Sequence, residues 1–303
     1  MAFRTLTIDS AAELHVRSGQ LTVQRETDSK PLQIDLDDLT CIVLANLDIT
    51  LSTGALNIIS EHGITILGCG RNFMPTNIML PFARNSRYSE VVDAQLSMTL
   101  PFQKRLWKKL VQQKITNQSE LLRLNGHSAY IELVEIAQAV RSGDPDNREA
   151  VAAKRYFPLL KPGYMRAEVS PTSSILNYGY AVVRSSIARS IVAHGFISSV
   201  GLHHDNVRNE FNLVDDLIEP FRPMVDLQML AINLDDEDAE HLSRRARQEM
   251  TTVLRNACIV DGHKTSCLLA IEQVVRSLKR AVEKRDAHAL VLPSLIPIEK
   301  VEQ

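Results

Sequence analysis

The hydrophobic positions change their spacing along the chain, and this change predicts two parts with different folds. From Thr5 to about Leu80, short apolar runs rich in β-branched residues alternate with turn residues, which is typical of strands. Residues 52–62 instead repeat their apolar positions at helical spacing, so we expect one short helix packed on a sheet. Beyond residue 82, long helical patterns take over. The pattern indicates an α+β protein, with a small N-terminal β-rich domain at residues 1–82 and a larger, mostly α-helical domain at residues 83–303.

The second part has three strong helical patterns, at residues 102–115, 175–192 and 268–282. We expect the segment 175–192 to form the centre of this domain. Residues 161–174 contain two prolines and a glycine, and they predict a loop. The alanine-rich segment that begins near residue 147 has high helix propensity, and either Asp146 or Asn147 can cap it.

The stretch from Gly201 to Pro223 places a histidine doublet ahead of a cluster of carboxylates. On a helical wheel its second half has an apolar stripe that would face a core, made of Val214, Leu217, Ile218 and Phe221. The opposite side carries the carboxylates Asp215, Asp216 and Glu219. Pro220 follows directly and cannot donate to the helix ladder, so a kink is expected beside a carboxylate.

His204 and Glu219 are too far apart along the chain to meet on one helix, because a straight helix would separate them by roughly 22 Å. The asparagines at positions 206, 209 and 212 favour turns and can fold His204 back toward the acidic side. Asn212 can also serve as N-cap, with Asp215 three positions later. The alternative is a solvated helix face beside a surface histidine, and the local pattern leaves both open.

The charge of the whole chain gives no sign of nucleic-acid binding, since the net charge is −2 and the pI is about 6.5. Such binding would need a local basic patch. Two candidates are the basic side of the helix at 102–115, with Lys104, Arg105, Lys108 and Lys109, and the cluster of Arg244, Arg245 and Arg247. Ordinary solvated lysines are the alternative. Trp107, the only tryptophan, is interpreted as a core residue.

Neither a membrane span nor a signal peptide is expected, because no apolar run reaches about 18 residues and the N-terminus lacks charged and apolar signal regions. We therefore expect a cytoplasmic protein without membrane contact. The four cysteines lack the paired short spacing of structural zinc sites, which fits buried free thiols in a reducing compartment.

One histidine among several carboxylates is an oxygen-rich donor set that suits Mg²⁺ or Mn²⁺ better than structural zinc. Such ions act on phosphate esters, so metal-dependent phosphodiester chemistry follows as a hypothesis. Glu149 is a candidate for a further ligand. It also falls in the first turn of its predicted helix, where the helix dipole alone would favour a carboxylate. The local sequence does not decide between a metal ligand and this structural role.

Several segments together resemble the CRISPR-associated Cas1 family, the integrase subunit of spacer acquisition, with a type II character. They are WKKLVQQKITNQ, GDPDNREAVAAKRYF, LNYGYAVVR and GLHH followed after 11 residues by DLIEPFRP. The resemblance implies that Glu149, His204 and Glu219 are catalytic and bind one divalent ion, with Asp216 in support. Without the family pattern, His203 and His204 could not be told apart. Close carboxylates repel when no ion is bound, so removing Glu149 should not destabilise the metal-free protein.

The resemblance also implies that the α-helical domain is the catalytic one, and that the protein is a DNA endonuclease or integrase of antiviral defence. The 3′-hydroxyl of a captured double-stranded DNA fragment would attack a phosphodiester at the CRISPR repeat. A homodimer that joins a small Cas2 partner subunit is implied as well. The alternatives are a general metal-dependent, structure-specific DNA nuclease, and a scaffold that holds DNA without catalysis.

Overall fold

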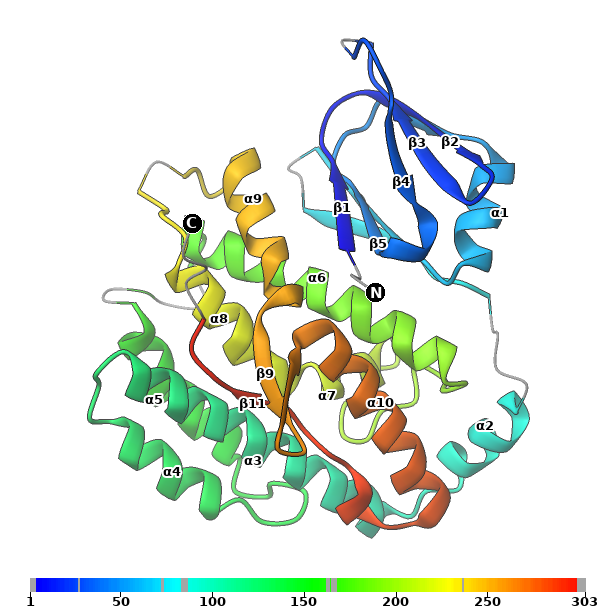
Figure 1. Cartoon of the computed structure of the whole chain (residues 1–303). Coiled ribbons are helices and arrows are strands. Elements are labelled where there is room, and N and C mark those ends of the chain that lie inside the picture. Colours follow the sequence, from blue (N-terminus) through cyan, green and yellow to red (C-terminus); the bar gives the residue numbers. More distant parts are fainter. Residues whose placement is uncertain are drawn as a thin grey trace.

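The protein has a β-rich N-terminal part that stands on a larger, mostly helical part (Figure 1), which confirms the expected α+β class. The computed structural model describes residues 4–26, 28–71, 74–82, 87–161, 164, 168–235 and 237–298. The expected domain boundary after residue 82 adjoins residues 83–86, which lie outside the described residues. This boundary remains a prediction.

Two four-stranded sheets build the N-terminal part. One has the order β4-β3-β2-β6, with β4 (Leu32–Asp35), β3 (Gln20–Gln24), β2 (Ala12–Arg17) and β6 (Ile49–Leu51). The other has the order β1-β5-β7-β8, with β1 (Arg4–Ile8), β5 (Leu39–Leu44), β7 (Thr65–Cys69) and β8 (Pro75–Met79). The expected short helix is confirmed as α1 (Thr53–Glu61), which Ser52 caps and which buries Ile59. A short 3-10 turn, η1 (Leu36–Asp38), precedes β5.

Helix α6 (Pro171–Ala193) lies along the side of the helical part that faces the N-terminal sheets (Figure 1), where it contacts β7 and β8 and packs against several other helices. The expected central position is therefore only partly confirmed. The other main helices are α2 (Tyr88–Leu96), α3 (Leu100–Leu124), α4 (Tyr130–Gln138), α5 (Arg148–Leu160), α7 (Asn212–Leu217), α8 (Arg222–Leu230), α9 (Arg244–Thr251) and α10 (Cys267–Lys284). Short elements complete it: η2 (Glu219–Phe221), η3 (Thr252–Arg255), η4 (Ala287–Ala289), and the small sheet of β9 (Ala257–Val260), β10 (His263–Ser266) and β11 (Ser294–Leu295).

Two helix boundaries differ from the expectation. Helix α3 runs nine residues past residue 115. The apolar pattern did not predict this extension because three polar side chains are buried there: Asn117, Gln118 and Ser119. The expected loop at 161–174 includes residues 162, 163 and 165–167, which lie outside the described residues. The prediction is wrong over residues 171–174, because Pro171 takes the first position of α6 and the Ser170 hydroxyl accepts a hydrogen bond from the Ser173 amide. Proline is favoured at a first helical position.

The two parts meet where α6 lies against β7 and β8, and an ion pair between Arg244 and Asp9 joins them at α9. The four cysteines are buried and free, as expected. Burial raises the pKa of the Cys41 thiol to about 12, which keeps it protonated. Among the described residues, none of the helices has the length and apolar character needed to cross a membrane.

Gly179 lies in the middle of α6, although glycine disfavours helices. A Cβ atom at this position would lie 2.5 Å from Met250 Sδ and 2.5 Å from Val225 Cγ1, so glycine lets α8 and α9 approach α6. We expect Gly179→Ala to lower the free energy of unfolding by about 1–3 kcal/mol through overpacking. Gly54→Ala is the control, because Gly54 is an exposed helical glycine where a Cβ atom would meet only Ser52 Oγ, at an ordinary contact distance of 3.8 Å. Urea unfolding measures both, and equal stability of the two variants would contradict the packing argument.

Candidate active site

The acidic side of α7 faces the interior of the protein. Val214, Leu217, Ile218 and Phe221 are fully buried, which confirms the apolar stripe. Asp216 is also fully buried and Glu219 is 3% exposed. The alternative of a solvated helix face is therefore wrong, because a buried carboxylate needs partners that a surface carboxylate does not.

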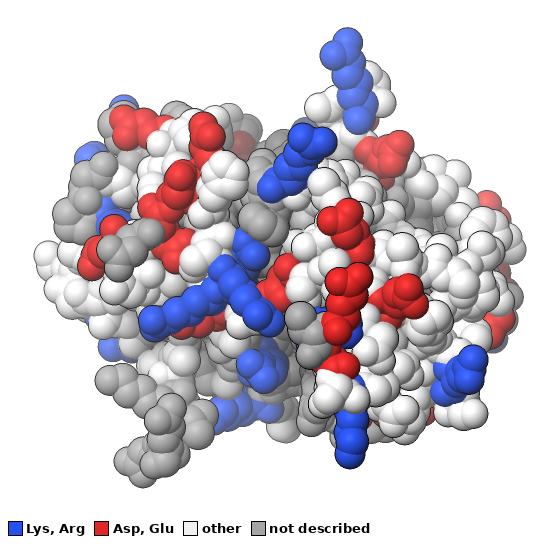
Figure 2. Space-filling view, turned by 90° about the horizontal axis from the view of Figure 1, so that it is seen from above, with Lys and Arg blue, Asp and Glu red and all other residues white. Residues whose placement is uncertain are grey.

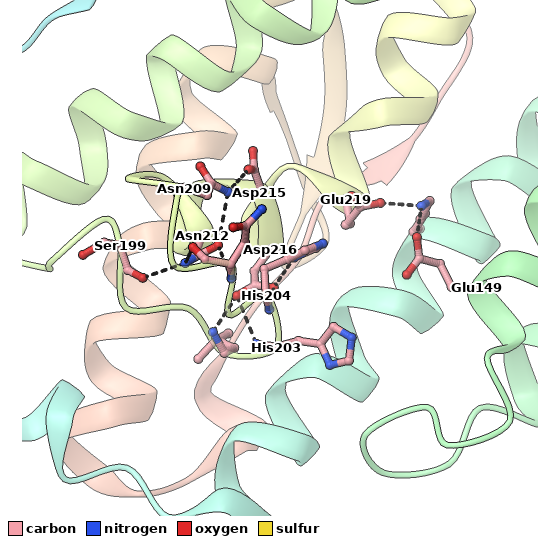
Figure 3. A network of polar contacts seen from close by, with 12 residues as sticks. Glu149, Ser199, His203, His204, Asn209, Asn212, Asp215, Asp216 and Glu219 are labelled. Carbon is pink, nitrogen blue, oxygen red and sulfur yellow. Dashed lines mark hydrogen bonds and ion pairs between the residues drawn. The ribbon is translucent and has the colours of Figure 1, made fainter. Parts of the chain in front are cut away.

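Asp216 organises the loop that carries the histidine doublet (Figure 3). Its carboxylate accepts hydrogen bonds from the backbone amides of residues 202 (2.5 Å), 203 (3.2 Å) and 204 (3.1 Å). The same carboxylate contacts His204 Nδ1 at 2.8 Å. A Cβ atom at Gly201 would clash with the His204 carbonyl and the Asp216 carboxylate, so this turn requires glycine. The Nδ1 contact leaves Nε2 as the His204 nitrogen that can bind a ligand.

Asparagines fold this loop back, as expected, although not by capping. The Asn212 amide donates to the carbonyls of Ser199 (3.0 Å) and Asn206 (3.1 Å). The expected N-cap at Asn212 is wrong, because α7 begins at this residue and its side chain serves the loop. Asp215 does not complete a capping box either. It forms a paired contact with the Arg184 guanidinium, with distances of 2.6 and 3.0 Å.

Trp107 contacts both histidines, but in different ways. It is 1% exposed, which confirms its place in the core. The His203 ring stacks on it at a centroid distance of 4.3 Å and an interplanar angle of 4°, and the His204 ring meets it edge-on at 5.7 Å. Only His204 has its imidazole against the buried Asp216. The family pattern and this contact therefore favour the same histidine.

Glu149 stands in the first turn of α5, and other residues cap that helix. Asp144 accepts hydrogen bonds from the backbone amides of Arg148 (2.8 Å) and Glu149 (3.0 Å). Asn147 is the N-cap, as expected, and accepts from the Ala150 amide. With the helix end capped in this way, the Glu149 side chain is left to bind Lys114 Nζ at 2.5 Å.

Lys114 joins Glu149 to Glu219, a contact that no local pattern of the chain predicts. Its side chain is 9% exposed, and its ammonium forms ion pairs with both carboxylates. Figure 3 shows the labelled Glu149 and Glu219 directed toward this shared position. Burial lowers the pKa of Lys114, but the charges of Glu219 and Glu149 outweigh burial and leave the pKa raised, so the ammonium is charged. The expectation that these carboxylates repel each other in the metal-free protein is therefore wrong, because a cation lies between them.

A second cation, Arg222, supports Glu219 from the next turn of the chain. Its Nε donates to Glu219 Oε1 at 2.8 Å, and its guanidinium lies 4.8 Å from the centroid of the Tyr180 ring. The Tyr180 and Tyr156 hydroxyls both donate to the buried Asp226, whose pKa burial raises to about 6. Burial also raises the pKa of Glu219, but Lys114 and Arg222 reverse this effect and lower it, so Glu219 is ionised at neutral pH.

Among the residues that the structure describes, no three histidine, cysteine, aspartate or glutamate side chains are grouped closely enough to hold one metal ion. The chemistry of the donors nevertheless suits a hard divalent ion. Glu149 and Glu219 share one cationic partner, so a cation that replaced the ammonium would meet both carboxylates. The pKa of the His204 imidazole is raised first by its hydrogen bond to Asp216, and the negative charge of Glu219 adds a smaller effect in the same direction.

The expected basic patches are smaller than the sequence indicated. The cluster at α9 is largely engaged, because Arg244 pairs with Asp9, Arg245 pairs with Glu249 at 2.7 Å, and Arg247 is 4% exposed. Basic and acidic side chains are interleaved on the face shown in Figure 2. On α3, the Lys109 ammonium donates to two backbone carbonyls, whereas Lys104 and Arg105 are exposed.

Comparisons with known proteins agree on one family. A family model described as CRISPR associated protein Cas1 matches residues 6–256. The CRISPR-associated endonuclease Cas1 of Neisseria meningitidis serogroup C is 32% identical over 304 residues, which cover 100% of this chain and 99% of that protein. A solved casposase bound to integration product has a TM-score of 0.73 at 18% identity, covering 100% of this chain and 96% of that one. A chain of a solved Cas6-RT-Cas1–Cas2 complex has a TM-score of 0.73 at 19% identity, covering 99% and 36%.

The His204–Asp216 contact predicts a pH-dependent stability. The hydrogen bond to Asp216 raises the pKa of His204 in the folded protein, above the ordinary value of about 6.5. The stabilising contribution is then fully present below the unfolded pKa and is lost as the pH rises through the folded one. We expect His204→Gln to lower the thermal midpoint most at pH 5–6 and progressively less toward pH 9.

The same contact can be observed directly in the wild-type protein. NMR titration of the His204 imidazole should give a pKa above the ordinary value, and this pKa should fall in Asp216→Asn, which lacks the negative partner. The imidazole signals of the other histidines serve as the internal reference. An unchanged His204 titration in Asp216→Asn would contradict the assigned contact.

Proposed function

The chain belongs to the Cas1 family of CRISPR-associated proteins, and from this premise we propose that it is a metal-dependent DNA integrase of spacer acquisition. The observation that supports this function most is the convergence of Glu149 and Glu219, from separate elements, on one cationic position. His204, held by the buried Asp216, completes the candidate set of ligands. The reaction would join the 3′-hydroxyl of a captured DNA fragment to the CRISPR repeat by transesterification.

Mg²⁺ or Mn²⁺, when bound, would polarise the attacked phosphate and assist loss of the hydroxyl proton. Glu149, Glu219 and His204 Nε2 are the proposed ligands. Asp216 has a different task, because its oxygens are occupied by the loop amides and by His204 Nδ1. It orients the imidazole and increases its basicity, as carboxylate partners of metal-binding histidines do. Arg222 orients Glu219 by donating to Oε1, whereas Lys114 pairs with Oε2.

We further propose that the protein acts on double-stranded DNA as a homodimer together with a small Cas2 subunit. The family membership supports this assembly, and so does the fold shared with a chain of the Cas1–Cas2 complex. The DNA-binding surface would include the exposed basic residues Lys104 and Arg105 of α3.

The central test is a strand-joining assay with the protein, its small partner, a short duplex and supercoiled repeat DNA. Products longer than the input DNA, formed only with Mg²⁺ or Mn²⁺, are the expected result. Cleavage without joining would instead favour a general structure-specific nuclease. Activity that a chelator leaves untouched would contradict the metal-dependent proposal.

Glu149→Ala tests whether this carboxylate acts in catalysis. We expect strand joining to fall by about two orders of magnitude or more, since even partners of metal ligands are worth about 10–100-fold. DNA affinity should persist because the basic surface is unchanged. Glu132→Ala is the matched control, a glutamate on neighbouring α4 whose partner is the exposed Arg155. Near-normal joining by Glu149→Ala, together with a lowered thermal midpoint, would reduce Glu149 to a structural residue.

DNA binding should depend steeply on salt despite the acidic pI, because each neutralised phosphate releases about 0.9 counterion. We expect replacement of both Lys104 and Arg105 by alanine to weaken binding at low salt and to reduce the logarithmic salt slope by about two. Arg245→Ala is the control, since Glu249 already neutralises that guanidinium. Fluorescence anisotropy at several salt concentrations measures the slope, and equal slopes for all three proteins would contradict the assignment to α3.

A further inference from the structure

Lys114 has no role of its own in the reaction proposed above, although its ammonium occupies the position on which Glu149 and Glu219 converge. Lys114 and Asn117 are one helical turn apart, and both are buried, at 7% and 1% exposure. Lys114 carries the charge that pairs with Glu149 and Glu219. Asn117 makes no ion pair, and its amide donates to the carbonyls of Pro220 (2.8 Å) and Pro293 (2.9 Å).

We propose that Lys114 is a displaceable internal counter-ion, whose ammonium holds Glu149 and Glu219 in the metal-free protein and leaves them when a divalent cation binds. This inference rests on the proposed metal site. It assigns to Lys114 a positioning role, and it predicts that the affinity of the site for the divalent ion is set by competition with the lysine.

The competition follows from the position of the two charges. The carboxylates that would bind the divalent ion are the same ones that hold the ammonium, so both cations need the same oxygens. Like charges a few ångströms apart repel, and the repulsion is stronger at a buried site than in water. The ammonium therefore stabilises the metal-free state and opposes the metal-bound state. By linkage, removing it must strengthen metal binding.

The surrounding backbone permits this exchange. The turn that contains Glu219 is tied to α3 through Asn117 and Pro220, independently of Lys114. The start of α5, with Glu149, is held by Asp144 and Asn147. Each carboxylate thus keeps its backbone position when the lysine moves. The side chain of lysine is long and flexible with a single charged atom, which suits displacement better than the planar fork of arginine.

The decisive experiment is a calorimetric titration of Mn²⁺ at pH 8 into wild type, Lys114→Met, Lys114→Arg and Lys154→Met, with thermal midpoints measured in EDTA and in Mn²⁺. Lys154 is exposed on α5 and carries the same charge, so its substitution is the matched control. We expect Lys114→Met to have a lower midpoint in EDTA, a Mn²⁺ dissociation constant about tenfold smaller, and a larger rise of the midpoint with Mn²⁺. The Mn²⁺ affinity and midpoints of Lys114→Arg should be closer to those of wild type. Those of Lys154→Met should equal the wild-type values.

Each other result has a defined meaning. Mn²⁺ binding by Lys114→Met that is unchanged or weaker than wild type would overturn the counter-ion role. Equal strengthening in Lys154→Met would overturn it as well, because the effect would then be one of net charge. Absence of Mn²⁺ binding by wild type would instead refute the proposed metal site itself, so the two failures can be distinguished.

A measurement on the wild-type protein covers the case in which Lys114→Met does not fold. Reductive methylation followed by mass spectrometry reports how accessible each lysine ammonium is. We expect Lys114 to react slowly in EDTA and several-fold faster in Mn²⁺, while the exposed Lys154 reacts equally in both. Equal protection of Lys114 with and without Mn²⁺ would show that the ammonium stays in place, which would overturn the proposal.

Discussion

Burial of carboxylates is the constraint on which the helical part of the protein depends. Asp216, Glu219 and Asp226 all lie within or next to α7, η2 and α8, and each is at most 3% exposed. An ionised group in such a place is costly unless charges or hydrogen bonds compensate it. The protein meets the cost differently at each position. Backbone amides and an imidazole surround Asp216, two cations flank Glu219, and two tyrosine hydroxyls serve Asp226.

These solutions explain why the site sits on irregular backbone. Beyond its first turn a regular helix uses its amides internally, so its middle has none to offer a buried carboxylate of another element. The loop at 201–204 has free amides because it is not helical, and Gly201 allows the close approach. Pro220 shortens the next segment to a 3-10 turn between α7 and α8. The carbonyl of Pro220 is then available to Asn117.

Sequence patterns correctly predicted those features of the structure that depend on neighbouring residues. The change from strand to helix spacing, the apolar stripe of α7, the asparagine break and the cap at Asn147 are all present. Each depends on residues within a turn or two of one another, so the sequence carries the whole signal. The extent of α3 was not predictable in this way, because its buried polar side chains satisfy partners in other elements.

The site was predictable only in part, for the same reason. The carboxylates and histidines were predicted as site residues because of their chemistry. The basic residues that pair with them lie elsewhere in the chain and were not predicted. Lys114 is 35 positions before Glu149, and nothing in its surroundings distinguishes it from the solvated lysines of the same helix. The basic clusters were overestimated for the converse reason. Arg244 and Arg247 form part of a basic run in the sequence, yet one pairs with Asp9 and the other is buried.

The two cations beside Glu219 differ in how firmly they are held. This difference gives one of them a structural role and allows the other to be exchanged for a metal ion. Arg222 lies against the Tyr180 ring and bonds Glu219 through Nε, so a planar group is fixed on two sides. Lys114 presents a single ammonium to two carboxylates at the end of a flexible stem. A buried carboxylate with only fixed counter-charges would be stable but closed to a new cation. With one fixed and one movable partner, Glu219 stays compensated before a metal ion arrives and can still accept it.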